Sequence, residues 1–116
     1  MIFVSMPYTH ENPVVVEERL NIAMRKIAEY ANIKKLAIAP SIYFHEIAKK
    51  NKLPVSYEYW KYFCEEFIKK SDIFIVLKTE GWESSVGVAN EIELAQKYNI
   101  PILYEDVNKI KNNYDV

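Results

Sequence analysis

The chain has 116 residues, of which 50% are hydrophobic and 27% are charged, and these values predict one domain with a core large enough to fold alone. The 15 Lys and Arg residues nearly balance the 16 Asp and Glu residues and form no basic stripe, so we do not expect duplex nucleic acid as a partner. The chain has a single cysteine, and its N-terminus does not resemble a charged segment followed by an apolar leader, so we expect a cytoplasmic protein. The longest apolar run covers only residues 73–77, which is too short to cross a bilayer, so we expect no membrane association.

Four short apolar runs predict strands, and they lie at residues 2–4, 36–39, 73–77 and 102–104. None of these runs alternates with polar residues, and continuous apolar strands are typical of parallel sheets that are covered on both faces.

The first predicted helix follows the first strand, with Asn12 as its N-cap and Pro13 in the first helical position. Apolar side chains then recur at spacings of three or four and form one buried stripe: Val16, Leu20, Ala23, Ile27 and Ala31.

Three further helices are predicted along the chain. A shorter helix over residues 42–50 ends before Pro54, and Ser56 then opens a helix whose buried stripe consists of Trp60, Cys64, Phe67 and Ile68. The last clear helix begins near Ser84 or Ser85 and ends near Tyr98, and a polar tail after the fourth strand is expected to be helical from Val107.

This order of elements predicts an α/β domain over residues 1–116 with three layers, a flavodoxin/Rossmann-like parallel sheet of four or five strands in the order 2-1-3-4. In such sheets a ligand binds at the carboxyl ends of the strands where the strand order reverses, here between the first and third strands. Residues 5–12 and 78–85 are therefore expected to form the walls of a binding crevice.

Both glycines of the chain, Gly81 and Gly87, lie close together after the third strand. Gly81 permits a tight turn, and Gly87 lets a ligand approach the first turn of the next helix. Ser84, Ser85 and the free N–H groups behind them make this helix start favourable for an anion. The alternative is an ordinary turn that contains Gly and ends in a Ser cap.

Glu91 lies one turn after Gly87, on the edge of the apolar stripe of the last helix. Partial burial there would prepare its carboxylate to act as a nucleophile or base. The alternative is a residue on the flank of the helix that remains in water.

Polar and aromatic residues also follow the first two strands at the same edge of the sheet. Pro7, Tyr8 and His10 offer an aromatic face and a titratable ring, and the alternative is a loop that packs its tyrosine over the core. Ser41 and His45 follow the second strand, where His45 either reaches the ligand or has a structural role.

No metal and no cofactor is expected. The two histidines and Cys64 lack the spacing of metal ligands, and Cys64 lies on a buried stripe with no histidine at helical spacing. Cys64 is therefore interpreted as a core thiol.

Several segments together resemble a known family: residues 3–10 (FVSMPYTH), residues 39–41 with His45, Trp60, residues 71–72, and residues 81–91 (GWESSVGVANE). They resemble a small domain family related to nucleoside 2-deoxyribosyltransferases and to 2'-deoxynucleoside 5'-phosphate N-hydrolases, and the resemblance covers nearly the whole chain. Its most specific part is the pattern Gly-Trp-x-x-Ser-x-Gly-x-x-x-Glu, present as Gly81, Trp82, Ser85, Gly87 and Glu91.

The resemblance implies that Glu91 attacks the anomeric carbon of a deoxyribose and releases the base, and that a second base or water then resolves the glycosyl-enzyme. It implies that Ser85 contacts the sugar or its 5'-phosphate, and that a homodimer or larger homo-oligomer completes the site. The residues expected to bind the nucleoside or nucleotide are Pro7, Tyr8, His10, Ser41, His45, Trp82, Ser84, Ser85 and Gly87.

The chain departs from its catalytic relatives at two positions. The relatives tend to carry a tyrosine where Phe3 stands, which helps to hold the nucleophile, and an aspartate near Cys64, which helps to protonate the leaving base. Losing an acid that assists the leaving group costs on the order of a hundredfold in rate. The alternative to an enzyme is therefore a non-catalytic nucleotide-binding protein, a sensor or sequestering protein, with the same crevice. A protein that only binds other proteins would not need a helix start that favours an anion, so the sequence gives this third class of function little support.

Overall fold

The computed structural model describes residues 1–54 and 56–107. Its elements in chain order are β1 (Ile2–Ser5), α1 (Pro13–Asn32), β2 (Ala37–Ile38), α2 (Pro40–Asn51), α3 (Tyr57–Lys69), β3 (Ile73–Leu77), the short 3₁₀ helix η1 (Trp82–Ser84), α4 (Val86–Lys97) and β4 (Ile102–Glu105). The tail that the sequence predicts to be helical lies, beyond Val107, outside the described residues.

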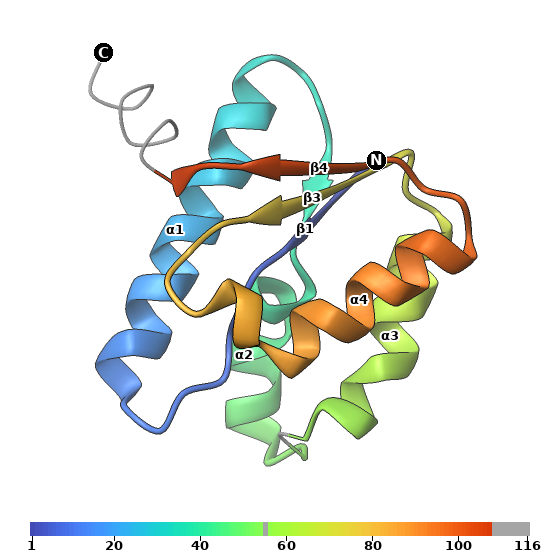
Figure 1. Cartoon of the computed structure of the whole chain (residues 1–116). Coiled ribbons are helices and arrows are strands. Elements are labelled where there is room, and N and C mark those ends of the chain that lie inside the picture. The colour runs from blue at the N-terminus through green and yellow to red at the C-terminus, as the bar shows by residue number, and fades with distance from the viewer. Residues whose placement is uncertain (55, 108–116) are drawn as a thin grey trace.

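The strands form one parallel sheet in the order β2-β1-β3-β4, as the sequence predicts (Figure 1). The central strand β1 pairs Ile2 with Ala37 on one side and with Ile73 on the other, and β3 pairs Phe74 with Ile102. Within the described residues the sheet has 4 strands. The strand order reverses between β1 and β3, so the loops that leave these two strands diverge and leave room between them.

Helices cover both faces of the sheet, which gives the three layers of a Rossmann-like domain (Figure 1). On one face, Val4 and Ile75 pack against Ala23 of α1. On the opposite face, Phe3 and Phe74 pack against α3 and α4, and their two rings stack with centroids 5.2 Å apart. Because side chains alternate between the two faces of a strand, the continuous apolar runs supply both cores.

The capping residues predicted from the sequence begin the helices. The side chain of Asn12 accepts a hydrogen bond from the Val14 N–H, and Pro13 occupies the first turn of α1. Ser85, one of the two candidates, is the N-cap of α4, where its side chain accepts from the Val88 N–H.

β2 is shorter than the sequence predicts. Leu36 is 69% exposed and lies before the strand, and Pro40 begins α2 directly after Ala39. Proline has no N–H to donate to a sheet, so it ends the strand and suits the first turn of a helix. The helix that the sequence places at residues 42–50 therefore begins earlier, at Pro40.

The buried face of α1 contains a charged residue that apolar periodicity does not predict. Lys26 is 3% exposed and forms an ion pair with Glu105 at the end of β4. Glu105 also accepts a hydrogen bond from the Tyr30 hydroxyl at 2.8 Å. Ala31, placed on the buried stripe by its spacing, is exposed instead. The ion pair therefore connects β4, an edge strand of the sheet, to α1.

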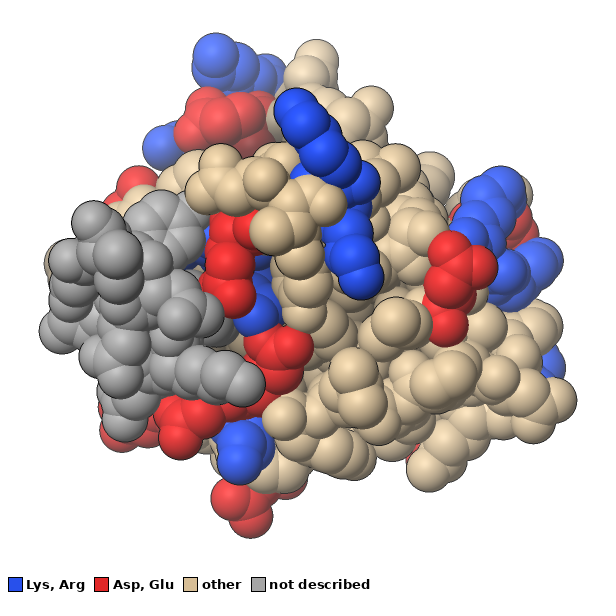
Figure 2. Space-filling view, turned by 90° about the horizontal axis from the view of Figure 1, so that it is seen from above, with Lys and Arg blue, Asp and Glu red and all other residues tan. Residues whose placement is uncertain are grey.

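Acidic and basic side chains are interspersed on the face of the molecule that Figure 2 shows, with Lys and Arg lying beside Asp and Glu. Within the described residues, no helix combines the length and the apolar character needed to cross a bilayer.

Candidate active site

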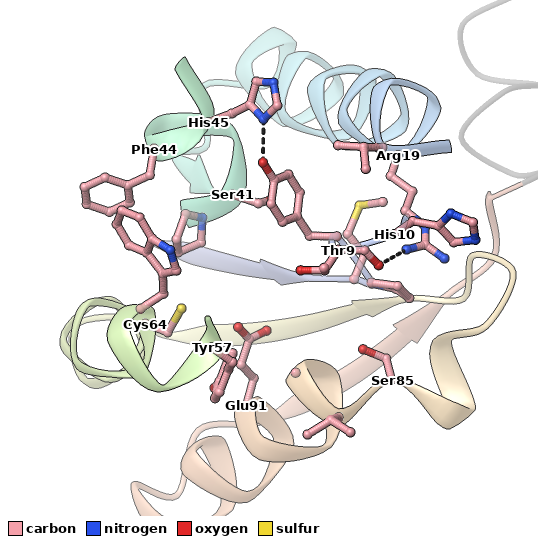
Figure 3. A pocket seen from close by; sticks show the side chains of 18 of the residues that line it. Thr9, His10, Arg19, Ser41, Phe44, His45, Tyr57, Cys64, Ser85 and Glu91 are labelled. Atoms are coloured by element: carbon pink, nitrogen blue, oxygen red, sulfur yellow. Dashed lines mark hydrogen bonds between the residues drawn. The ribbon is translucent and has the colours of Figure 1, made fainter. Parts of the chain in front are cut away.

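A cavity of about 910 Å³ opens at the carboxyl edge of the sheet, between the loops that follow β1 and β3 (Figure 3). Its walls come from the β1–α1 loop, the first turns of α1 and α2, the first half of α3, and the loop and first turns of α4. The volume lies in the range of small-molecule sites. The crevice therefore lies where the sequence predicts it.

Glu91 of α4 points into this cavity (Figure 3). The Ser5 hydroxyl, which lies at the end of β1 and is 1% exposed, donates a hydrogen bond to Glu91 Oε1 at 2.6 Å. Burial raises the pKa of Glu91 from 4.5 to about 7, and the hydrogen bonds from Ser5 and Cys64 act in the opposite direction. Glu91 is thus a fixed carboxylate that gains or loses its proton near neutral pH.

Tyr57 and Cys64 of α3 lie close to Glu91, and all three residues line the cavity (Figure 3). Burial and the charge of Glu91 raise the pKa of the Cys64 thiol, so Cys64 stays neutral and is a core thiol that also borders the site. The same two causes raise the pKa of the Tyr57 phenol. The Tyr57 hydroxyl is buried and has no hydrogen-bond partner within the described part of the chain.

The loop before α4 forms the opposite wall. Gly81 has φ of 85°, a left-handed conformation that favours glycine, and it turns the chain into η1. Ser84 donates a hydrogen bond from Oγ to the Gly81 carbonyl, while Ser85 caps α4. Ser84, Ser85 and Gly87 all line the cavity, so the unpaired N–H groups of the first turn of α4 are available to a ligand there.

The β1–α1 loop forms the wall of the cavity on the side of α2. The Tyr8 hydroxyl and His45 Nδ1 share a hydrogen bond, and their rings meet edge to face. His10 also lines the cavity, where its Nδ1 accepts from the Asn12 N–H at 2.9 Å. Tyr8 therefore links the first loop to α2.

Arg19 was not identified from the sequence. Its guanidinium donates to the Thr9 carbonyl at 2.9 Å (Figure 3), and it lies near Gly81 of the opposite loop. Among the described residues that line the cavity it is the only Lys or Arg, and Glu91 is the only Asp or Glu. The clue available in the sequence was its position on the edge of the α1 stripe, next to Leu20.

The end of the cavity between α2 and α3 is aromatic. The ring centroids of Phe44 and Trp60 are 4.7 Å apart, and Phe63 lies 5.2 Å from Phe44. Trp60 donates its indole N–H to the Pro54 carbonyl at 2.9 Å, which leaves ring faces as its contribution to the wall. Such a surface suits a flat apolar or aromatic group.

The structure brings together most of the residues predicted to bind a ligand. Pro7, Tyr8, His10, Ser41, His45, Ser84, Ser85, Gly87 and Glu91 all line the one cavity. It does not bring Trp82 there: Trp82 packs against the core cluster that contains Phe3 and Phe74, and its ring centroid lies 5.7 Å from that of Tyr104. Tyr57 and Arg19 were missed, and the sequence placed Ser5 in the crevice wall without a role, because its partner Glu91 is 86 positions away in the sequence.

Comparison with protein families finds one match over residues 1–106, to a family described as a domain of unknown function (DUF1937). No curated protein matches the chain.

Proposed function

The chain belongs to the DUF1937 family of domains of unknown function, and we propose that it cleaves or exchanges the N-glycosidic bond of a deoxynucleoside or a deoxynucleoside 5'-monophosphate. The observation that carries the proposal is Glu91: a carboxylate fixed by Ser5, open to a cavity and with a pKa of about 7. A carboxylate with this pKa is ionised in roughly half of the molecules near neutral pH, which suits a nucleophile.

In the proposed reaction an oxygen of Glu91 attacks the anomeric carbon. The new carbon–oxygen bond forms as the carbon–nitrogen bond breaks, and the electron pair of the broken bond leaves with the base, which takes up a proton from water. Water or a second base then attacks the same carbon and releases Glu91, so the anomeric configuration is retained.

The two ends of the cavity differ in a way that suits the two ends of a nucleotide. Arg19, Ser85 and the N-terminus of α4 supply positive charge and donors for a phosphate. Phe44 and Trp60 supply ring faces on which a base would stack. Figure 3 shows Glu91 between Phe44 on one side and Ser85 and Arg19 on the other, and the anomeric carbon of a nucleotide likewise lies between its base and its phosphate.

The second candidate is a nucleotide-binding protein without catalysis. The observation that favours it is Cys64, which contacts Glu91 with a thiol whose pKa is raised. In the catalytic relatives that the chain resembles, an aspartate near this position assists the leaving base. The enzyme, if active, is therefore expected to be slow, by on the order of a hundredfold.

The test is to incubate the protein with deoxynucleosides and deoxynucleoside 5'-monophosphates and to measure released base by chromatography. Release that is lost in Glu91→Gln and kept in Glu93→Gln, an exposed glutamate of the same helix, supports the glycosidase. Equal release by both variants excludes Glu91 as the nucleophile. No release, together with a raised unfolding temperature in the presence of one nucleotide, supports the binding protein instead.

A further inference from the structure

The guanidinium of Arg19 lies between two walls of the cavity. On one side it donates a hydrogen bond to the Thr9 carbonyl of the β1–α1 loop at 2.9 Å. On the other side lies the loop after β3, where a Cβ atom added to Gly81 would be 3.7 Å from Nη2 of Arg19. An arginine side chain has many rotamers, and ordering it costs conformational entropy. The hydrogen bond to the Thr9 carbonyl therefore restricts the direction in which the charge of Arg19 points.

A second hydrogen bond holds the loop that carries this carbonyl. The Tyr8 hydroxyl and His45 Nδ1 share it, and their ring centroids are 5.8 Å apart. Burial and the charge of Glu46 raise the pKa of the Tyr8 phenol, so the phenol keeps its proton and donates to His45. Figure 3 draws this bond at His45 and the bond between Arg19 and Thr9 as dashed lines. Because Tyr8 and Thr9 are adjacent in the sequence, the first bond anchors the Thr9 carbonyl to α2.

We infer that Tyr8 and His45 are positioning residues for Arg19. Their hydrogen bond fixes the Thr9 carbonyl, and this carbonyl directs the guanidinium toward the phosphate of a bound nucleotide. The inference rests on the proposed function, in which Arg19 and the start of α4 hold the phosphate. Loss of the hydrogen bond between Tyr8 and His45 frees the loop and lets the guanidinium turn away. It therefore weakens the binding of the phosphate and leaves the binding of the sugar and the base unchanged.

The experiment compares ligands with and without a phosphate. Calorimetric titration measures the binding of the four 2'-deoxynucleoside 5'-monophosphates and of the four deoxynucleosides, in the Glu91→Gln background to prevent turnover. Tyr8→Phe keeps the ring and removes the hydroxyl, and it should weaken the binding of the monophosphates about tenfold, the factor that corresponds to one hydrogen bond. The binding of the deoxynucleosides should stay unchanged. Tyr43→Phe is the matched control and should change neither, because Tyr43 lies on α2, is 55% exposed and is not among the residues that line the cavity.

Further variants show whether the effect passes through Arg19. Arg19→Gln should weaken the binding of the monophosphates more than Tyr8→Phe does, since it removes the charge itself. In the Arg19→Gln background, Tyr8→Phe should have no further effect, because the two substitutions act on one interaction. His45→Leu should repeat the effect of Tyr8→Phe. His45→Asn should preserve the binding of the monophosphates, because its amide oxygen can accept the hydrogen bond of the phenol.

The outcomes separate this inference from the proposed function. If Tyr8→Phe weakens monophosphates and deoxynucleosides equally, the hydrogen bond only stabilises the loop and the inference is wrong. The inference is also wrong if Tyr8→Phe changes no affinity, or if its tenfold effect persists in the Arg19→Gln background, even when the parent protein releases base. If no ligand binds any of the proteins, the proposed function fails, and the inference fails with it.

Discussion

The strongest prediction concerns the effect of Glu91 on stability as a function of pH. Burial raises the pKa of Glu91 from 4.5 to about 7 in the folded protein. Below the lower value the carboxyl is protonated in both the folded and the unfolded chain. Between the two values only the folded chain holds the proton, so the free energy of unfolding falls as pH rises through this range. Above the higher value the carboxyl is ionised in both the folded and the unfolded chain, so the free energy of unfolding reaches its lowest value and stops falling.

The magnitude follows from the pKa values. Each pKa unit corresponds to about 1.4 kcal/mol, and the opening of the cavity to water reduces the effect, so we expect a loss of about 2–3 kcal/mol. Glu91→Gln removes the charge and keeps an oxygen that accepts from Ser5. Relative to the parent, this variant should gain about 2–3 kcal/mol between about pH 5 and about pH 8.

Urea unfolding of both proteins across this pH range measures the difference directly. Glu93→Gln serves as the control, and because Glu93 is exposed, its difference from the parent should stay constant with pH. A constant difference for Glu91→Gln as well would refute the reasoning, since it would mean that the folded protein holds the Glu91 carboxylate at no cost.

Three further predictions concern Ser5 and Gly87 near Glu91, and the buried ion pair of Lys26. Ser5→Ala removes a donor that favours the carboxylate, so the pKa of Glu91 should rise further. The pH at which the rate of base release reaches half of its maximum on the acid side should therefore rise as well. An unchanged pH at half-maximum would contradict this prediction. Gly87→Ala should keep or raise helix stability by up to about 1 kcal/mol. Its new methyl group meets neighbours at ordinary contact distance but occupies the cavity, so calorimetry should show weaker nucleotide binding. Lys26→Met breaks the ion pair with Glu105, and urea unfolding should show a loss of about 2–3 kcal/mol, whereas an unchanged midpoint would mean that the pair adds nothing.

The placement of the cavity and of Glu91 could be predicted because both follow from local patterns. Apolar runs without alternation indicate parallel strands, and the strand order then puts the carboxyl ends of β1 and β3 at one crevice. The spacing from Gly87 to Glu91 puts both residues on one side of α4, and both line the cavity.

The contacts that prepare Glu91 could not be predicted in this way. Ser5 and Glu91 are 86 positions apart in the sequence, and their hydrogen bond exists only because β1 lies in the centre of the sheet, beneath α4. The Tyr57 ring likewise lies beside Gly87 in the first turn of α4, a contact between two residues far apart in the sequence. Trp82 shows the converse, since it lies inside the most specific motif of the sequence yet packs on the core outside the cavity.

The sequence by itself therefore determined the strands, the helices, the order of the sheet and the edge at which a ligand would bind. These features depend on periodicity and capping, which act over neighbouring residues. The tertiary structure alone decided which side chains meet: Lys26 with Glu105 in a buried ion pair, Ser5 with the Glu91 carboxylate, and the Tyr57 ring with the first turn of α4 at Gly87. Such contacts join residues far apart along the chain, and the geometry of the packed layers, which periodicity does not record, brings them together.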